Sequence, residues 1–336
     1  MSKSSDLQDL LAHGSMPEER ILFHPILMQL AARLNNSTYT EFMTDYRVLV
    51  ESNVKCLEKF DMDAVGLISD PYRETSAFGA RVEFYGNKSP YCQPVVNTYE
   101  DLGHLTNPNI LMSDRTSDRI RAAEYYVRLL GNSVPIIGWI EGPLAEAADL
   151  AGVNNILLKI LVEEDFVRKL MDICLVTAKD FARCQIEAGC LVIGIGDAVC
   201  SQVDPGVYEN LIFPLHRELV EYIHSLDAFV KMHICGDITH LLELLGQTGI
   251  DILDLDWMVD FDLARQAVGD KTVLCGNLDP VSCIQDLSAD KLAAAGSNLI
   301  SSQKDRPFIF SGGCEITPDT PPENMMVLRK ISKLAV

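Results

Sequence analysis

The chain has 336 residues, of which 48% are hydrophobic and 23% are charged, as in an ordinary globular protein. This length fits two domains or one decorated α/β barrel, and the composition excludes a disordered chain, a collagen-like fibre and a coiled coil. The 48 acidic and 28 basic residues give a net charge of −20, which makes nucleic acid and anionic membranes poor partners.

Residues 1–19 form a polar N-terminal extension without the apolar segment and cleavage site of a signal peptide. No apolar run reaches the roughly 18 residues that a membrane span needs. We therefore expect a cytoplasmic protein whose ten cysteines are reduced thiols. Each cysteine is then either a packing residue or a ligand.

Short apolar runs rich in β-branched residues alternate with amphipathic segments through residues 20–336, which we assign to one domain. Near-continuous hydrophobic runs of this kind are typical of parallel strands buried on both faces. The eight predicted strands are residues 21–26, 64–69, 134–140, 191–195, 229–234, 252–255, 272–274 and 308–310.

The segments between these runs carry apolar residues at i, i+3, i+4 and i+7, which predicts helices. The first begins with a capping box, because Glu41 follows Thr38 by three positions. The predicted helices include residues 38–60, 116–130, 154–187, 205–225, 238–248, 261–269 and 323–334. The alternation predicts an α/β protein, a single (β/α)8 TIM barrel, with a doubly wound sheet as the alternative.

Residues 70–99 follow the second predicted strand as a long segment without helical periodicity. The pattern predicts an irregular loop with a β-hairpin over the mouth of the barrel. Long loops after barrel strands are more often functional than accidental.

Polar or sulfur-bearing residues stand at all eight predicted strand ends, where an α/β barrel carries its chemistry. Core packing alone would not produce this pattern, which therefore predicts an enzyme or a small-molecule binding site. These ends carry His24; Ser69 and Asp70; Trp139 and Glu141; Asp197, Cys200 and Ser201; His233, Cys235 and Asp237; Asp254, Asp256 and Trp257; Cys275, Asn277 and Asp279; and Ser311, Cys314 and Glu315.

His233 and Cys235 are two positions apart on the fifth predicted strand, so their side chains point the same way. Cys314 follows the eighth strand, and in a closed barrel both strand ends face one pocket. One nitrogen and two sulfurs make a good ligand set for zinc, whose catalytic sites keep a position open. Cys275 is the alternative third ligand, and the other reading is a packed histidine beside two buried thiols.

Glu141, Asp197 and Asp70 lie at strand ends, where each could be a general acid or base, a fourth zinc ligand, or a capping residue. Asp254 and Asp256 point to one side of the sixth strand. Two like charges aimed at one pocket need a cation or a shared proton, and a zinc ion would supply that cation.

Trp139 and Trp257 are the two tryptophans of the chain, and both fall at predicted strand ends. As core residues they would only fill space. At the mouth they would form a flat apolar wall for a substrate or a macrocycle.

The runs MHICGDITHLLELLGQTGIDILDLDW, LCGNLDP and FSGGCEITPDTPPENM resemble the uroporphyrinogen decarboxylase superfamily, most closely its zinc-dependent, corrinoid-linked methyltransferase branch. The resemblance extends over nearly the whole chain. It implies a (β/α)8 barrel whose H-x-C…C motif, His233, Cys235 and Cys314, binds zinc. It further implies a corrinoid-binding partner protein that exchanges a methyl group with a small-molecule donor or acceptor.

For a methyltransferase of this branch, Glu141, Asp197 and Asp70 are the catalytic candidates. Trp139, Trp257, Asn277 and Asp256 are the candidates for contacting the corrinoid. The donor or acceptor stays open between a thiol and a methyl ether or other methylated compound.

Two alternatives remain. True uroporphyrinogen decarboxylases carry an arginine-bearing segment at the first strand that clamps substrate carboxylates. The corresponding stretch here, ILFHPILMQL, has no arginine, and a net charge of −20 disfavours a polyanionic tetrapyrrole. The other alternative is a non-catalytic zinc- or corrinoid-binding accessory protein.

Overall fold

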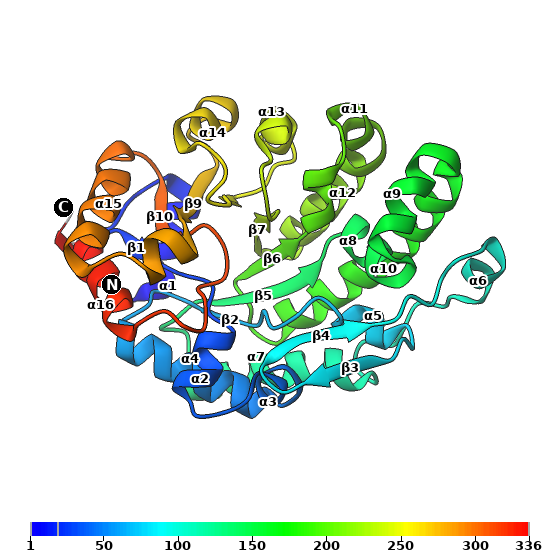
Figure 1. Ribbon diagram of the computed structural model, residues 1–336, viewed down its shortest axis with the longest axis horizontal. Helices are drawn as coiled ribbons and strands as arrows, with labels where there is room; N and C mark the ends of the chain where they lie inside the picture. Colours follow the sequence, from blue (N-terminus) through cyan, green and yellow to red (C-terminus); the bar gives the residue numbers. More distant parts are fainter. Residues whose placement is uncertain (1, 19, 335–336) are drawn as a thin grey trace.

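The computed structural model describes residues 2–18 and 20–334, so parts of both predicted regions, Met1, Glu19 and residues 335–336, lie outside the described residues. Eight parallel strands are hydrogen-bonded in the order β1-β10-β9-β8-β7-β6-β5-β2 and curl into a barrel (Figure 1). They are β1 (Leu22–Phe23), β2 (Val65–Gly66), β5 (Ile136–Glu141), β6 (Val192–Gly196), β7 (Phe229–His233), β8 (Ile252–Asp254), β9 (Val273–Leu278) and β10 (Phe308–Gly312). The (β/α)8 barrel predicted from the sequence is confirmed.

The barrel closes at the seam between its two shortest strands, β1 and β2. The backbone N–H of Asp63 donates to the carbonyl of Phe23 at 2.9 Å, and the Asp63 carboxylate accepts from the N–H of Phe23 at 2.8 Å. Arg20 and Arg329 hold the same carboxylate at 3.1 and 2.9 Å. A buried, doubly paired aspartate therefore replaces a long strand ladder at this seam.

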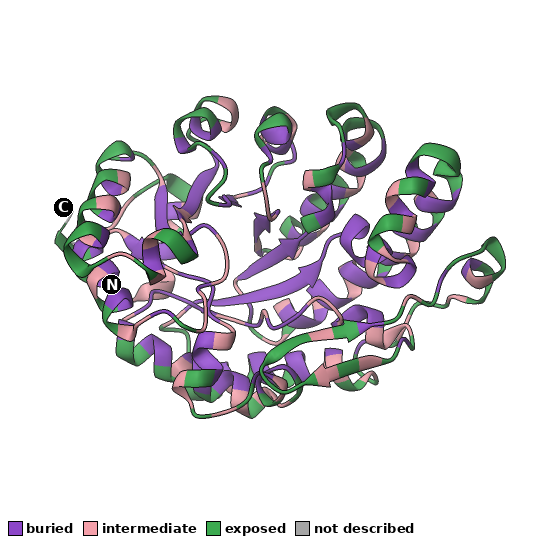
Figure 2. Ribbon diagram, in the orientation of Figure 1, coloured by how far each residue is buried: buried purple, intermediate pink, exposed green. Residues whose placement is uncertain are grey.

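The helices form an outer layer around the strands, and burial is concentrated in the strands and on the inner helix faces (Figure 2). The longer ones are α1 (Lys3–His13), α4 (Tyr46–Phe60), α7 (Asp114–Leu130), α8 (Pro143–Ala151), α9 (Val153–Val162), α10 (Glu164–Glu187), α12 (Phe213–His224), α14 (Phe261–Val268), α15 (Ala289–Ser302) and α16 (Pro322–Leu334). The shorter ones include α2 (Gln29–Leu34), α3 (Tyr39–Thr44), α5 (Arg73–Ala77), α6 (Tyr99–His104), α11 (Pro205–Val207) and α13 (Leu242–Leu245).

Two helices predicted as continuous are each broken once. The capping box of Thr38 and Glu41 is present, but α3 ends at Asp45, whose extended backbone and side chain cap the start of α4. The segment 154–187 is likewise divided at Glu163 into α9 and α10. The apolar periodicity continues through each break, because the helices on either side pack on the same core.

One tryptophan side chain fills the barrel interior at the level of the middle of β5 and β6. Trp139 on β5 is in register with Gly194 on β6, and Gly194 is in register with Lys231 on β7. The indole ring of Trp139 covers both Gly194 and Gly196, because a Cβ atom at either position would press against it. Glycine on β6 is therefore what allows the tryptophan to lie inside the barrel.

The lower end of the barrel is closed by α1. Leu7 and Leu10 of this helix join a buried apolar cluster whose other members come mainly from the lower ends of the strands, among them Leu22, Ile137 and Ile252. The N-terminal segment thus seals the end of the barrel opposite the strand carboxyl ends.

The segment after β2 contains the predicted hairpin, formed by β3 (Val82–Tyr85) and β4 (Lys88–Cys92). It is docked on α3, where Thr40 and Tyr39 bond to Gly86 and Asn87 at the hairpin turn. Its coverage of the barrel mouth stays a prediction. Among the described residues, no helix is both long and apolar enough to cross a membrane.

Candidate metal centre

The structure brings His233, Cys235 and Cys314 together at the carboxyl ends of β7 and β10. Their ligand atoms all lie within 4.8 Å of one another. The Sγ of Cys235 is 3.2 Å from Nε2 of His233 and 3.9 Å from Sγ of Cys314. His233 is buried, and both cysteines are partly exposed toward the mouth.

The His233 ring is oriented by a backbone carbonyl. Its Nδ1 lies 3.1 Å from the carbonyl oxygen of Asp254, which can only accept, so Nδ1 carries the proton. Nε2 is thereby turned toward the two sulfurs. Metal-binding histidines are commonly held in this way by their second nitrogen.

The electrostatics of the three side chains favour a thiolate at Cys314. The hydrogen bond from Cys235, with His233 close by, lowers the pKa of the Cys314 thiol to about 5. Burial alone would lower the pKa of His233, but its hydrogen bond with Cys314 and the charge of Asp254 raise it to about 9. The hydrogen bond with Cys314 also raises the pKa of Cys235 far above its ordinary value.

This donor set fits zinc. A tetrahedral zinc with bonds of about 2.3 Å to sulfur places two sulfur ligands roughly 3.8 Å apart, close to the 3.9 Å between Cys235 and Cys314. Three protein ligands leave a fourth position for a substrate or water. His233, Cys235 and Cys314 are thus the residues that could hold the metal.

A second group of three potential ligands among the described residues is Asp197, Cys200 and His216. Here the donor atoms of Asp197 and His216 already have partners. The Asp197 carboxylate accepts from the N–H groups of Leu144 and Ala145 at the start of α8 and lies 2.9 Å from His216 Nε2, and His216 Nδ1 contacts Tyr208. Asp197 therefore caps a helix and points away from the barrel interior.

Cys275, the alternative third ligand, does not join the centre. It is fully buried in the apolar cluster that includes Leu7 and Leu10 of α1, and its sulfur lies 4.0 Å from Nζ of Lys231. Lys231 forms an ion pair of 2.8 Å with Asp254. Lys231 therefore supplies a cation for the carboxylate of Asp254 on β8. Lys231 was not among the residues predicted from the sequence, although its position two residues before His233 puts both side chains on one face of the strand.

Glu141 lies level with the centre. It is in register with Gly196, and Gly196 is in register with His233, so the Cα atoms of Glu141 and His233 are about 10 Å apart across a residue without a side chain. Arg73 contacts Glu141 at 3.1 Å. Burial, followed by the charge of Glu74, nevertheless keeps the pKa of Glu141 well above its usual range. Glu141 is thus a buried carboxyl group whose environment favours the protonated form.

The Asp70 carboxylate is paired with two arginines. Arg115 holds its carboxylate with two contacts of 2.7 and 2.9 Å, and Ser69 donates at 2.8 Å. Although burial opposes it, Arg115 and Arg73 hold the pKa of Asp70 well below its ordinary value. Asp70 is therefore a fixed anion in an ion-pair network.

The side chains of Asn277 and Asp256 form hydrogen bonds with the backbone of the loop after β8. The Asn277 amide donates to the carbonyls of Asp256 and Val259 at 3.0 and 2.7 Å, and the Asp256 carboxylate accepts from the N–H groups of Gly236 and Met258. Through Gly236, the Asp256 carboxylate holds the backbone next to Cys235.

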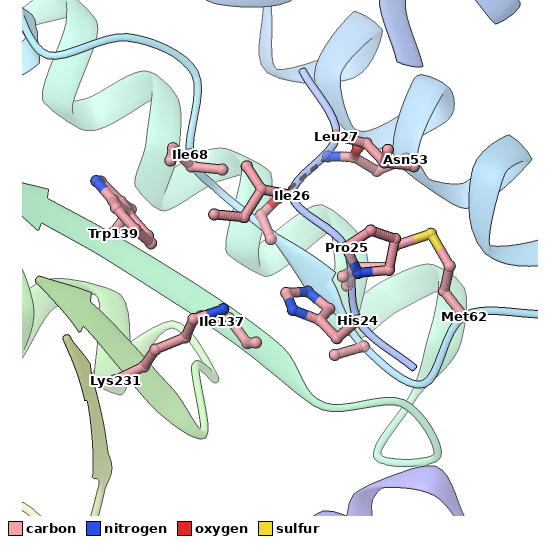
Figure 3. Close-up of a pocket in the computed structure, with 13 residues that line it drawn as sticks. His24, Pro25, Ile26, Leu27, Asn53, Met62, Ile68, Ile137, Trp139 and Lys231 are labelled. Carbon is pink, nitrogen blue, oxygen red and sulfur yellow. Dashed lines mark hydrogen bonds between the residues drawn. The ribbon is translucent and has the colours of Figure 1, made fainter. Parts of the chain in front are cut away.

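The two tryptophans have different environments. Trp139 is buried inside the barrel and lines a small cavity with His24 and Lys231 (Figure 3). Trp257 is 45% exposed, and its backbone packs so closely on Gly313 that a side chain there would overlap it. Trp257 thus lies at the mouth beside Cys314, whereas Trp139 lies beneath it.

The chain is similar to known proteins over almost all of its length. A family model described as uroporphyrinogen decarboxylase (URO-D) matches residues 16–333. The methylcobamide:CoM methyltransferase MtbA of Methanosarcina mazei is 27% identical over 240 residues, which are 71% of this chain and 69% of that protein. A uroporphyrinogen decarboxylase of Solibacter usitatus is 26% identical over 276 residues, which are 80% and 78% of the two chains.

A solved structure of a methyltransferase from Methanosarcina mazei superposes with a TM-score of 0.89 at 20% identity, covering 99% of this chain and 98% of that one. At this identity the likeness establishes the fold. The relatives are enzymes of two kinds, methyltransferases and decarboxylases, and the resemblance stated from the sequence motifs is confirmed.

Proposed function

The chain belongs to the uroporphyrinogen decarboxylase family, and from this premise we propose that it is a zinc-dependent methyltransferase that moves a methyl group between a corrinoid protein and a small substrate. One observation carries the proposal: an imidazole nitrogen and two thiol sulfurs within 4.8 Å of one another at the carboxyl ends of barrel strands. Thiolate sulfurs are ligands that select metals such as zinc.

His233, Cys235 and Cys314 would hold the zinc, which lowers the pKa of a bound thiol or polarises a bound ether oxygen. Asp254 keeps the His233 ring turned toward the sulfurs through its carbonyl. Glu141, which lies across Gly196 from His233 and whose pKa is raised by burial, would give a proton to a leaving alkoxide or thiolate.

The corrinoid carried by the partner protein would reach the centre from the mouth, where Trp257 offers an exposed apolar face. The barrel of residues 20–336 would carry the activity. Residues 1–19 would act as an extension that closes its lower end.

The arginines near the mouth are already paired with carboxylates, which disfavours the decarboxylase alternative. Arg73 is fully buried with Asp70, Glu74 and Glu141 around it, and Arg115 is bound to Asp70. Neither is free to pair with the carboxylates of a tetrapyrrole.

Zinc content tests the centre. We expect about one zinc per chain in the purified protein by mass spectrometry, stoichiometric zinc in Cys275→Ala, and a large loss in His233→Ala and Cys314→Ala. Because Cys275 is a buried thiol outside the centre, its variant controls for the loss of a cysteine as such. Full zinc in His233→Ala and Cys314→Ala would refute the site.

Methyl transfer tests the reaction. The zinc-loaded protein is incubated with methylcobalamin and a set of thiols, and with cob(I)alamin and methylated ethers, amines and thioethers, while the corrinoid spectrum is followed. We expect turnover with at least one class, abolished in Cys314→Ala. Zinc binding without turnover in any arm would favour the accessory-protein alternative, and release of CO₂ from uroporphyrinogen would favour the decarboxylase.

A further inference from the structure

A buried ion pair lies directly beneath the metal centre, between Lys231 on β7 and Asp254 on β8. The Nζ of Lys231 is 2.8 Å from Oδ2 of Asp254, and each side chain is at most 2% exposed. Lys231 stands two residues before His233 on the same strand, and Asp254 is in register with His233 on the next strand. All three side chains therefore face the barrel interior on adjoining levels.

No bulk solvent reaches this pair. Lys231 lines a cavity of about 20 Å³ with His24 and Trp139, which is room for a single water molecule (Figure 3). The Cys275 sulfur lies 4.0 Å from Nζ of Lys231. A buried ion pair adds little stability over an apolar pair of the same volume, whereas breaking it leaves a costly lone charge. Its presence here calls for a role other than stability.

Asp254 touches the metal-binding histidine at two points. Its backbone carbonyl lies 3.1 Å from His233 Nδ1, and its carboxylate Oδ2 lies 3.6 Å from the same nitrogen. Carbonyl and carboxylate therefore compete for one N–H. The carbonyl has the hydrogen bond, and the carboxylate is held by Lys231 instead.

We propose that Lys231 and Asp254 are positioning residues for the metal centre. The ammonium group keeps the Asp254 carboxylate off the His233 ring, so that Nδ1 stays on the rigid backbone carbonyl and Nε2 stays aimed at the sulfurs. This proposal rests on the zinc-binding function proposed above. It assigns a purpose to a charged pair that lies below the ligands and outside the reach of a substrate.

The proposal predicts an asymmetry between the two partners. In Lys231→Met the freed carboxylate turns onto Nδ1 and tilts the ring away from the sulfurs, and zinc affinity falls about 10- to 100-fold, the usual cost of losing a supporting contact. Adding Asp254→Asn removes the competing charge, so the double variant recovers most of that affinity. A purely packing role predicts the opposite, with the double variant at least as weak as the single one.

The zinc dissociation constant is measured by competition with a chromophoric chelator. The cobalt(II)-loaded forms report ligand geometry through their visible absorption, and thermal unfolding verifies that each variant is folded. Lys271→Met, an exposed lysine on the loop before β9, is the matched control and should bind zinc like the wild type. Should Lys231→Met not fold, Lys231→Gln carries the same test with a smaller expected loss.

Wild-type affinity in the folded Lys231 variant, or no recovery in the double variant, overturns the positioning role while leaving the zinc site intact. Absence of zinc binding in the wild type and in Lys271→Met would instead overturn the proposed function itself. Weakening by Lys231→Met together with recovery by Asp254→Asn supports the positioning role.

Discussion

The sulfur atoms of Cys235 and Cys314 lie 3.9 Å apart although 79 positions separate the two residues in the chain. β7 and β10 are not neighbours in the sheet, since β8 and β9 lie between them. Curling of the sheet brings their carboxyl ends to one mouth. The close approach of the two thiols is therefore a property of the barrel.

The reactivity of Cys314 should reveal its low pKa. Because Cys235 donates to it and His233 lies close, the pKa of Cys314 is about 5, and the metal-free protein should carry a thiolate there at pH 6. Alkylation by iodoacetamide, followed by peptide mass spectrometry, should be nearly as fast at pH 6 as at pH 8. An ordinary thiol slows by roughly 80-fold over that interval.

Cys283 is the internal control for this measurement, because it is partly exposed and burial raises its pKa. Its alkylation should rise steeply with pH. A Cys314 rate that rises in parallel with that of Cys283 would contradict the assignment, and added zinc should protect Cys314 while leaving Cys283 unprotected.

Asp70→Asn should destabilise the fold. The substitution leaves the buried Arg73 and the adjoining Arg115 without their shared carboxylate, and removing one partner of a buried pair costs about 3–5 kcal/mol. Urea unfolding at pH 7 measures the loss, with the exposed Asp172→Asn as the control. A loss below about 1 kcal/mol would mean that the network is not structural.

The same variant has a defined pH dependence. Because the folded-state pKa of Asp70 lies below its ordinary 3.8, its stabilisation is present above that value and is lost as the pH falls below it. The difference between wild type and Asp70→Asn should therefore shrink in acid. A constant difference down to low pH would contradict the ion-pair explanation.

Glu146→Gln should stabilise the protein at alkaline pH. Burial, then the charges of Glu74 and Asp149, raises the pKa of Glu146 well above 4.5, so the native state keeps its proton. A raised acid contributes stability that is present below its unfolded-state pKa and is lost as the pH rises, by up to about 1.4 kcal/mol per pH unit.

Glutamine keeps the contact with Thr75, which donates to Glu146 Oε2 at 3.1 Å, and it has no proton to lose. Melting temperatures measured from pH 5 to pH 8.5 should diverge in favour of the variant as the pH rises. The exposed Glu124→Gln serves as the control and should follow the wild type. Parallel curves for Glu146→Gln would show that Glu146 is not protonated in the native state.

Gly194→Ala should disturb the barrel interior, because the new methyl group would overlap the ring of Trp139. Overpacking of this kind costs about 1–3 kcal/mol. The displaced indole should also shift the tryptophan fluorescence. Gly103→Ala, on α6 with open space around it, is the control and should be neutral or slightly stabilising. Unchanged fluorescence and stability in Gly194→Ala would place the indole elsewhere.

Local patterns predicted a large part of this molecule. All eight strands are present near their expected positions, since a strand buried on both faces must be apolar throughout. The H-x-C spacing predicted that His233 and Cys235 lie side by side on a strand; β7 ends at His233, and Cys235 just beyond it still places its sulfur 3.2 Å from Nε2 of His233. The breaks at Asp45 and Glu163 were missed, because both helices of each pair face the same core and so share one apolar pattern.

The sequence alone determined the fold class, the strand order along the chain and the three candidate metal ligands. Tertiary structure alone decided the partner of each charged group. In the tertiary structure, Cys275 lies outside the centre and Asp70 pairs with Arg115. Asp197 accepts hydrogen bonds at the start of α8, and Asp254 pairs with Lys231. Such pairings depend on distances between elements far apart in the chain, and in a low-dielectric interior those distances decide whether a carboxylate is an anion, an acid or a cap.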